Sequence, residues 1–311
     1  MKKICAVMLL MVLLVTLASC RVNRRGGEVS GWDDKAYQIG DAEITDVIDT
    51  IDIGWSSGSV TVVPAKGKNI TLTEVITGTV TDEKRMHWQV EGKTLRIRYS
   101  APGMNITLPM NCEKRLTVAV PENVQLTGLS ISSASAQVNV EGIAADRMAL
   151  ASASGRLDIT ADARDMSIST ASGKVVLKQQ GTMDSLALST ASGKVEADLA
   201  HVKDAAMSSA SGSFVIKAGA AETLTVQTAS GKINCSFAST PKKVRLECTS
   251  GDVTLAMPEA NGFTARVETG SGSFDTGIAV RKQGKTYLCG DGKAEIDIST
   301  TSGDVFISQS K

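Results

Sequence analysis

The stretch LALSTASGKVEADL, residues 186–199, contains the pattern that decides the fold. Apolar or small side chains occupy every second position before the Ser192-Gly193 step and again after it. Alternation with a period of two indicates half-buried β-strands. The stretch therefore predicts two strands joined by a sharp turn at Ser192-Gly193.

The same unit recurs along much of the chain. The glycine of the turn returns at intervals of 18 to 21 residues, at Gly155, Gly173, Gly193, Gly212, Gly231, Gly251 and Gly272. A further copy, Gly303, follows 31 residues later, and a degenerate copy, Ala134-Ser135-Ala136, precedes them all. A two-strand unit of about 19 residues cannot bury its apolar side alone, so neighbouring units must stack. The sequence predicts an all-β fold, a parallel β-solenoid of two-strand repeats over residues 129–311.

Recurrence also gives the turn residues a structural interpretation. A glycine column predicts a turn with positive φ, and the serine before each glycine predicts a ladder of hydroxyl groups. A catalytic serine needs a base, yet the two histidines, His87 and His201, lie outside the turns. A Ser–Lys pair with Lys174 or Lys194 remains an option, but nine equivalent serines favour architecture over nucleophilic catalysis.

The residue after each turn glycine defines a second column. It is basic at Arg156, Lys174, Lys194 and Lys232, and acidic farther on, at Asp252 and Asp304. Because stacked strands lie about 4.8 Å apart, we expect the four cations to form one row. This basic column is a candidate surface for a wall polymer or for lipid headgroups. The alternative is a solvated corner of long side chains.

Two regions depart from the regular repeat. Residues 42–128 are rich in strand patterns but less periodic, and they contain an early relative of the repeat with Ser57-Gly58 as its turn. We expect this region to cap the first apolar coil. Residues 278–293 separate the last two copies and predict an inserted loop or hairpin that carries Cys289.

The N-terminus has the layout of a bacterial export signal. Lys2 and Lys3 precede an uncharged apolar run, Ile4–Leu17, which is shorter than the roughly 20 residues that a membrane-spanning helix needs. Leu17-Ala18-Ser19-Cys20 resembles the lipobox of bacterial lipoproteins, and the resemblance implies cleavage after residue 19 and lipid attachment at Cys20. Residues 20–41 then predict a flexible tether, and the protein is expected on a membrane, outside the cytoplasm.

Charge and cysteine content exclude some functions. The chain carries 33 basic and 33 acidic residues, which argues against bulk nucleic-acid binding. Of six cysteines, four lie beyond the anchor: Cys112, Cys235, Cys248 and Cys289. The strand register places Cys235 and Cys248 on the apolar side, which predicts buried free thiols, whereas the spacing leaves disulfide formation open. No ligand set for a metal or cofactor is apparent.

Three stretches carry a resemblance to a known family: IDIGWSSGSVTVVP (51–64), LTVAVPENVQLTGLSISSASAQV (116–138) and GDGKAEIDISTTSGDVFIS (290–308). With the repeated Ser-Gly turns, they resemble the bacterial putative-adhesin family of β-strand-repeat proteins, a domain-of-unknown-function family of exported and membrane-anchored proteins. The resemblance covers roughly residues 44–308. It implies a β-repeat fold and brings no established catalytic residues.

These observations predict a lipid-anchored, extracytoplasmic, non-enzymatic interaction module. Its candidate partners are the membrane itself through the lipid, an envelope polymer, an anionic lipid or another surface protein. Two alternatives remain open: a polysaccharide-acting β-helix enzyme, which would need several converging carboxylates, and an envelope-stress sensor that contacts a membrane protein.

Overall fold

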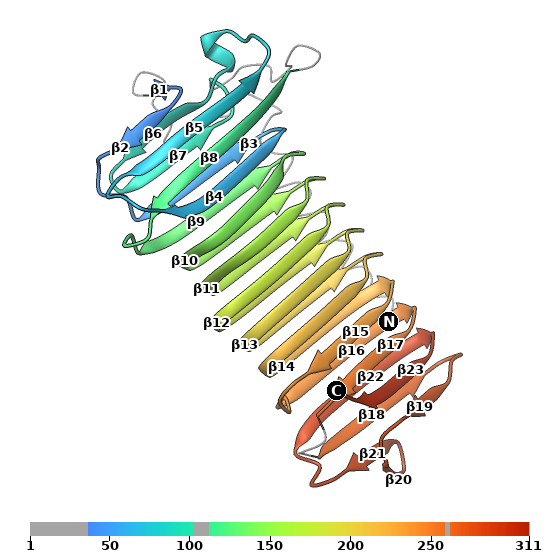
Figure 1. Ribbon diagram of the computed structural model, residues 1–311. Helices are drawn as coiled ribbons and strands as arrows, with labels where there is room; N and C mark the ends of the chain where they lie inside the picture. Colours follow the sequence, from blue (N-terminus) through green and yellow to red (C-terminus); the bar gives the residue numbers. More distant parts are fainter. Residues whose placement is uncertain (1–36, 102–111, 259–261, 311) are drawn as a thin grey trace. The chain divides into compact units, whose positions relative to one another are not determined.

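The protein is an all-β chain (Figure 1). A computed structural model describes residues 37–101, 112–258 and 262–310. The helical element among them is the short 3-10 helix η1 (Asp82–Lys84), and no helix in the described part is long and apolar enough to cross a membrane. The predicted export signal and Cys20 lie outside the described residues. The predicted tether ends earlier than residue 41, because Gln38–Ile39 already form strand β1.

The described residues divide into two compact units, 37–163 and 164–310. The N-terminal unit contains β1 (Gln38–Ile39), β2 (Ala42–Ile44), β3 (Thr50–Trp55), β4 (Ser59–Ala65), β5 (Ile70–Thr77), β6 (His87–Glu91), β7 (Thr94–Arg98), β8 (Glu113–Pro121), β9 (Leu126–Ser133) and β10 (Gln137–Ser152). β11 (Leu157–Thr170) crosses the boundary. The C-terminal unit contains β12 (Val175–Thr190), β13 (Val195–Ser209), β14 (Phe214–Ser230), β15 (Ile233–Phe237), β16 (Lys243–Ser250), β17 (Val253–Met257), β18 (Phe263–Thr269), β19 (Phe274–Thr276), β20 (Arg281–Gln283), β21 (Thr286–Cys289), β22 (Ala294–Ser302) and β23 (Val305–Gln309).

In the N-terminal unit, β3 and β4 form the early coil that the Ser57-Gly58 turn predicts. β3 pairs in parallel with β9, and β4 pairs in parallel with β10, so the early coil stacks on the degenerate copy of the repeat. On the opposite edges, β7 and β8 pair in parallel with β3 and β4. Segments more than seventy residues apart, such as Thr50 and Gly128, therefore become direct neighbours.

Antiparallel strands close this unit. β5 pairs antiparallel with β8 and β6 with β7, and the short strands β2 and β1 then line the edges of β5 and β6. Edge strands of two or three residues offer few free backbone groups to a further strand. The region predicted as a less regular cap thus ends two parallel ladders with antiparallel pairs.

In the C-terminal unit the repeats stack in register. β13 lies between β12 and β14, with Val195 opposite Val175 on one side and Phe214 on the other (Figure 1). Each of these strands runs from one Ser-Gly turn to the next, so the second strand of one predicted unit continues into the first strand of the following unit. A register shift marks the junction, as in β12 between Gln179 and Thr182. The predicted all-β fold of stacked parallel repeats is confirmed, although these coils are single long strands.

The last coils do not follow chain order. β16 and β17 pair with β22 and β23, which in turn pair with β18 and β19. The chain therefore builds the outer coil of β18 and β19 first, and then inserts its final coil between this one and β16–β17. The segment 278–293, predicted as an inserted loop or hairpin, contains the antiparallel hairpin β20–β21, which returns the chain for this insertion.

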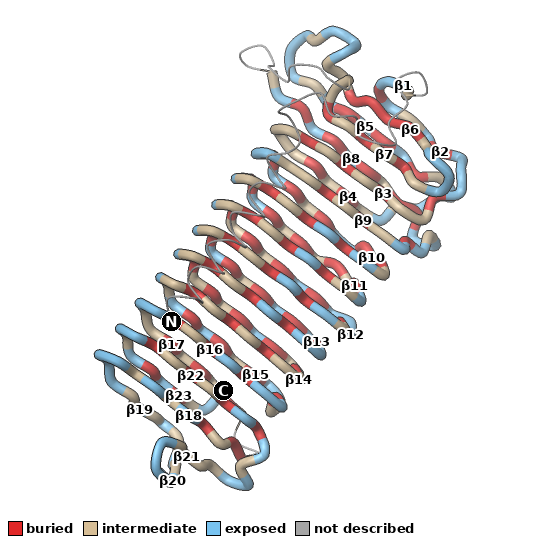
Figure 2. The backbone as a smooth tube through the Cα atoms, turned by 180° about the vertical axis from the view of Figure 1, so that it is seen from behind, coloured by how far each residue is buried: buried red, intermediate tan, exposed pale blue. Residues whose placement is uncertain are grey.

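The core follows the period-two pattern (Figure 2). Inward positions of successive coils, such as Val195, Phe214, Ile233 and Val253, are fully buried. Burial of one such side chain contributes about 1.5–3 kcal/mol.

Two cysteines belong to this core. Cys235 and Cys248 are buried free thiols, as predicted. Burial raises the pKa of Cys235 to about 12, so its sulfur stays protonated and behaves as a small apolar group.

Glycine is required at the turns because the coils approach closely there. A Cβ on Gly193 would lie 2.0 Å from the carbonyl oxygen of Gly173, and one on Gly212 would lie 2.2 Å from that of Gly193. These distances are far below van der Waals contact. The expected positive φ is found at Gly231, Gly251 and Gly303. Gly58, the turn glycine of the early coil, also has a positive φ, of 83°. Positive φ is absent at Gly155, Gly173, Gly193, Gly212 and Gly272, where the prediction was wrong. At all of these but Gly173, a Cβ would lie 2.2 Å or less from a carbonyl oxygen, so steric proximity is the reason for glycine.

We predict that Gly193→Ala lowers the free energy of unfolding by about 1–3 kcal/mol, the usual range for overpacking. The matched control is Gly277→Ala, whose Cβ would lie 3.7 Å from Cζ of Phe306, an ordinary contact. Chemical denaturation measures both variants. Equal midpoints for the two would contradict the steric explanation.

Candidate functional site

The buried hydroxyls of the repeat complete the turns. The Oγ atoms of Ser152, Thr170, Thr190 and Ser209 accept hydrogen bonds from the backbone N–H of the glycine three residues later, at 2.9, 3.0, 2.9 and 2.6 Å. At Cys248 a thiol takes this position and donates to the carbonyl oxygen of Gly231 at 3.2 Å. These groups bind the backbone of the turns, and their burial keeps them away from solvent.

The serines directly before the glycines are exposed, and they contact backbone rather than one another. The hydroxyls of Ser135, Ser154, Ser192 and Ser211 donate to carbonyl oxygens of the neighbouring coil at 3.4–3.5 Å. A hydroxyl-to-hydroxyl contact is present between Ser271 and Ser302, at 3.2 Å. The predicted hydroxyl ladder is therefore wrong at these four turns, where each hydroxyl donates to a backbone carbonyl oxygen instead.

The predicted basic column is paired with carboxylates. Nζ of Lys174 lies 2.8 Å from Oε2 of Glu196, and Nζ of Lys194 lies 2.8 Å from Oε1 of the same carboxylate. Hydrogen bonds from Lys174 and then Lys194 lower the pKa of Glu196 to about 2. One carboxylate thus bridges two rungs of the column.

The other two cations of the column also have partners. Nε of Arg156 lies 2.6 Å from Asp158, two residues later, and Nζ of Lys232 lies 2.9 Å from Asp252 of the adjacent coil. All four predicted residues therefore stand beside a negative charge. The column is a row of ion pairs, and the prediction that it binds a polyanion stays a prediction.

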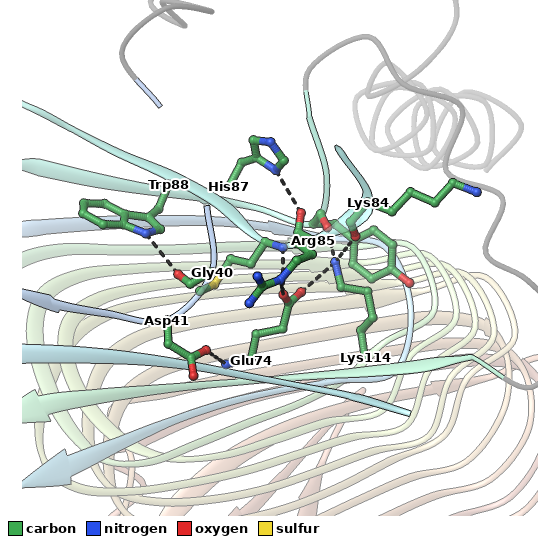
Figure 3. Close-up of polar contacts among 10 residues, drawn as sticks. Gly40, Asp41, Glu74, Lys84, Arg85, His87, Trp88 and Lys114 are labelled. Atoms are coloured by element: carbon green, nitrogen blue, oxygen red, sulfur yellow. Dashed lines mark hydrogen bonds and ion pairs between the residues drawn. The ribbon is translucent and has the colours of Figure 1, made fainter. Parts of the chain in front are cut away.

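The N-terminal unit contains a buried ionic centre that sequence reasoning missed (Figure 3). Lys114 on β8 is fully buried, and its Nζ lies 2.7 Å from Oε1 of Glu74 on β5. The ammonium also donates to the backbone oxygens of Lys84 (2.7 Å) and Tyr99. It lies 4.0 Å from the ring centroid of Tyr99 and 4.9 Å from that of Trp55. Its charge is therefore neutralised and its donors are used.

Glu74 connects this centre to the start of the fold. Its Oε2 accepts the backbone N–H of Met86 at 2.9 Å, and its own N–H donates to Asp41, just after β1, at 2.7 Å. Burial lowers the pKa of Lys114, while the hydrogen bond and charge of Glu74 act in the opposite direction. The alternation of β8 carried a signal for this centre, because Lys114 shares the inward phase of Leu116 and Val118.

His87 lies near the ionic centre and is also buried. Its Nδ1 is 2.9 Å from the backbone oxygen of Arg85, and burial lowers its pKa. Its ring packs edge-on against Tyr37. These contacts give His87 a packing role in the cap and separate it from the serines of the turn columns.

The hairpin β20–β21 presents three neighbouring cations. Arg281, Lys282 and Lys285 form no ion pair with any residue that the structure describes, whereas the nearby Arg266 and Lys293 pair with Glu268 and Asp291. Beside the hairpin lies an open hollow of about 480 Å³, lined by Val267, Glu268, Thr269, Lys282, Gly284, Lys285 and Tyr287. The run RKQGK, residues 281–285, was the sequence signal for this site.

Potential metal ligands do not cluster in the part of the chain that the structure describes. Within residues 37–101, 112–258 and 262–310, no group of three or more His, Cys, Asp or Glu side chains could hold a metal ion. Cys112 and Cys289 are free and partly buried.

We predict that Lys114→Met costs about 3–5 kcal/mol of stability, because it leaves the Glu74 carboxylate buried without its partner. The double variant Lys114→Met/Glu74→Gln should be more stable than the single one. Arg115→Met, which removes an exposed pair with Glu113, is the control and should cost far less stability, because solvent screens such a pair. Equal losses for Lys114→Met and Arg115→Met in thermal denaturation would contradict this assignment.

We predict that the Glu196 carboxyl titrates near pH 2 instead of its ordinary 4.5. Because its folded pKa is below the unfolded value, the stabilisation is present above pH 4.5 and is lost as the pH falls through about 2. NMR titration should show the pKa rising toward 4.5 in Lys174→Ser/Lys194→Ser but not in Lys178→Ser on the same face of β12. An unchanged pKa in the double variant would rule out the bridge.

Several solved structures match this chain over most of its length. Among solved structures, a putative adhesin from Parabacteroides distasonis ATCC 8503 matches with 11% identity and a TM-score of 0.48, covering 87% of this chain and 96% of that one. A putative adhesin from Parabacteroides merdae ATCC 43184 matches with 8% identity and a TM-score of 0.44, covering 89% and 97%. A structure described as a putative lipid binding protein from Parabacteroides distasonis ATCC 8503 matches with 17% identity and a TM-score of 0.43, covering 89% and 97%.

Two sequence comparisons complete these findings. The search of curated proteins finds no match. The family model described as Toastrack DUF4097 matches residues 48–308, which include the early coil, the repeats and the last coil. The chain therefore belongs to the toastrack DUF4097 family.

Proposed function

We propose that this protein is a lipid-anchored, extracytoplasmic interaction module without enzymatic activity. The observation that carries the proposal is the order of the chain, in which a segment with the layout of an export signal, ending in Leu17-Ala18-Ser19-Cys20, precedes a repeat domain. A lipid-modified Cys20 would hold the domain on a membrane, since two or more acyl chains anchor durably. The repeat domain would then serve as a stable scaffold that presents side chains to partners.

The use of the polar groups in the repeats supports a binding role over catalysis. Buried hydroxyls bind turn glycines, exposed serines bind backbone carbonyls, and the column cations bind carboxylates. A glycan-cleaving enzyme would instead need carboxylates that converge on one cleft. Carboxylates such as Glu196 and Asp252 are engaged by lysines and lie on different coils.

Adhesion is the form of interaction that the descriptions of two solved relatives name, and for this chain it is part of the proposal. The candidate partners are an envelope polymer, an anionic lipid or another surface protein. The basic column remains one candidate surface, with its ion pairs as the competing interaction that a polyanion would have to displace. An envelope-stress sensor would present the same anchor and fold, and capture of a membrane-protein partner would identify it.

We predict that Cys20→Ala abolishes lipid attachment. In bacteria expressing the full chain, the wild type should incorporate labelled fatty acid and partition into the detergent phase, while Cys20→Ala should do neither. Cys5→Ala, which removes the other cysteine of the N-terminal segment, is the control and should stay labelled. Incorporation of label into Cys20→Ala would overturn the anchor and with it the proposed function.

A further inference from the structure

The hairpin β20–β21 differs from the rest of the C-terminal unit in its electrostatics. Along the repeats, lysines and arginines are mostly compensated by carboxylates, as at Lys203 with Asp184 and Lys242 with Glu222. Arg281, Lys282 and Lys285 are all exposed and form no ion pair with a described residue, although they lie within five consecutive positions. The hairpin therefore concentrates three cations without an ion pair, and the carboxylate that lines the hollow beside Lys282 and Lys285, Glu268, is paired with Arg266.

Packing fixes the position of this charge. Tyr287 on β21 lies against Phe274 of the outer coil, with ring centroids 4.5 Å apart, and Nζ of Lys282 lies 5.6 Å from the centroid of Tyr287. β21 also pairs with β18 from Phe263 to Arg266. The two-residue turn at Gly284-Lys285, with φ of +61° at Gly284, then exposes Lys285 at its tip. The cations stand on a supported hairpin.

Apolar side chains surround the cations. Ile278 and Val280 just before the hairpin, and Leu288 on β21, are only partly buried. In the outer coil, Val267 and Phe274 are also partly exposed, whereas Ile298 and Val305, which lie opposite them in the next coil, are buried. A surface that combines aliphatic and aromatic groups with adjacent cations suits a membrane interface, where apolar groups enter the headgroup boundary and cations meet phosphates.

The distribution of free charge favours lipid headgroups over an extended polymer. An extended polyanion would be bound best by a periodic row of cations along successive coils. The cations of the row that the repeats provide are paired with Glu196, Asp158 and Asp252. Arg281, Lys282 and Lys285 instead lie within five consecutive positions of one hairpin, whereas other unpaired lysines of the repeats, such as Lys178 and Lys217, stand singly. This compact group matches a point contact with a few headgroups. Each cation near an anionic bilayer adds attraction that salt weakens.

We propose that the hairpin β20–β21 binds anionic phospholipid headgroups through Arg281, Lys282 and Lys285. This inference rests on the proposed function, because the anchor brings the domain to a membrane. The hairpin supplies a second, reversible contact that is electrostatic and independent of the acyl chains.

The test uses the full-length chain carrying Cys20→Ala, so that no lipid is attached, in cosedimentation with vesicles. We expect binding to vesicles that contain phosphatidylglycerol, weak binding to phosphatidylcholine alone, and loss of the difference at high salt. Arg281→Gln/Lys282→Gln/Lys285→Gln should reduce partitioning onto the anionic vesicles by roughly 100-fold. Any contribution of the N-terminal segment, including its cations Lys2, Lys3, Arg21, Arg24 and Arg25, is shared by all variants, so the hairpin is judged by the difference between variants on the anionic vesicles.

The matched control removes the same charge elsewhere. Lys66, Lys178 and Lys217 are exposed and form no ion pair with a described residue, so Lys66→Gln/Lys178→Gln/Lys217→Gln should keep binding. Equal loss in both triple variants would show a general charge effect and overturn the hairpin assignment, as would equal binding to neutral vesicles. Displacement by soluble poly(glycerol phosphate) at matched phosphate concentration would overturn the choice of lipid.

The two proposals can fail separately. Vesicle binding by the unlipidated chain does not depend on whether Cys20 is modified in cells. If the wild type is lipidated but the purified chain ignores anionic vesicles, the hairpin inference falls and the anchor stands. If Cys20 carries no lipid but the vesicles bind, the proposed function falls and the headgroup contact stands.

Discussion

The fold depends on one steric constraint, the approach of successive coils at the Ser-Gly turn. The carbonyl oxygen of one turn glycine occupies the space that a Cβ of the next would need, at about 2 Å for Gly193 and Gly212. Glycine at this position lets the backbones stack, and the buried Ser or Thr three residues earlier binds the glycine N–H. Because every coil is fixed at the same point, strands such as β12, β13 and β14 pair in register and their apolar side chains form one core.

Stacking in register creates an electrostatic problem, since equal residues become neighbours on the surface. A column of lysines about 5 Å apart would repel itself. The chain avoids this by placing a carboxylate within reach of each cation: Asp158 two residues after Arg156, Glu196 between Lys174 and Lys194, and Asp252 opposite Lys232. The stacking that aligns the cations into one column therefore also places these carboxylates close enough to neutralise them.

The sequence was informative where the signal was periodic. Alternation and the glycine interval were enough to predict the stacked β-repeats and the inward thiols of Cys235 and Cys248. The order of the last coils was not predictable, because the turns at Gly272 and Gly303 have the same pattern and neither specifies its neighbour. Positive φ was wrongly predicted at Gly155, Gly193 and Gly212. Glycine is needed there because another coil lies close, and a sequence does not show that distance. Lys114 was missed because its charge suggested exposure, although its alternation phase pointed inward.

In each unit, the coil at the edge of the stack differs from the coils inside it. A coil inside the stack satisfies its hydrogen bonds and charges with the coils on both sides, so its outward residues have little left to offer a partner. An end coil has a neighbour on one side and must be closed by something else. The N-terminal unit closes its ladders with antiparallel strands around the Lys114–Glu74 pair. The outer coil of the C-terminal unit is covered by β21 only from Phe263 to Arg266 among the described strands, which leaves Val267 and Thr269 beside the hollow and the free cations. Because β21 covers this coil only in part, cations without an ion pair and partly exposed apolar groups lie together beside the hairpin β20–β21. The inner coils, whose register depends on the glycine turns, are not altered by this arrangement.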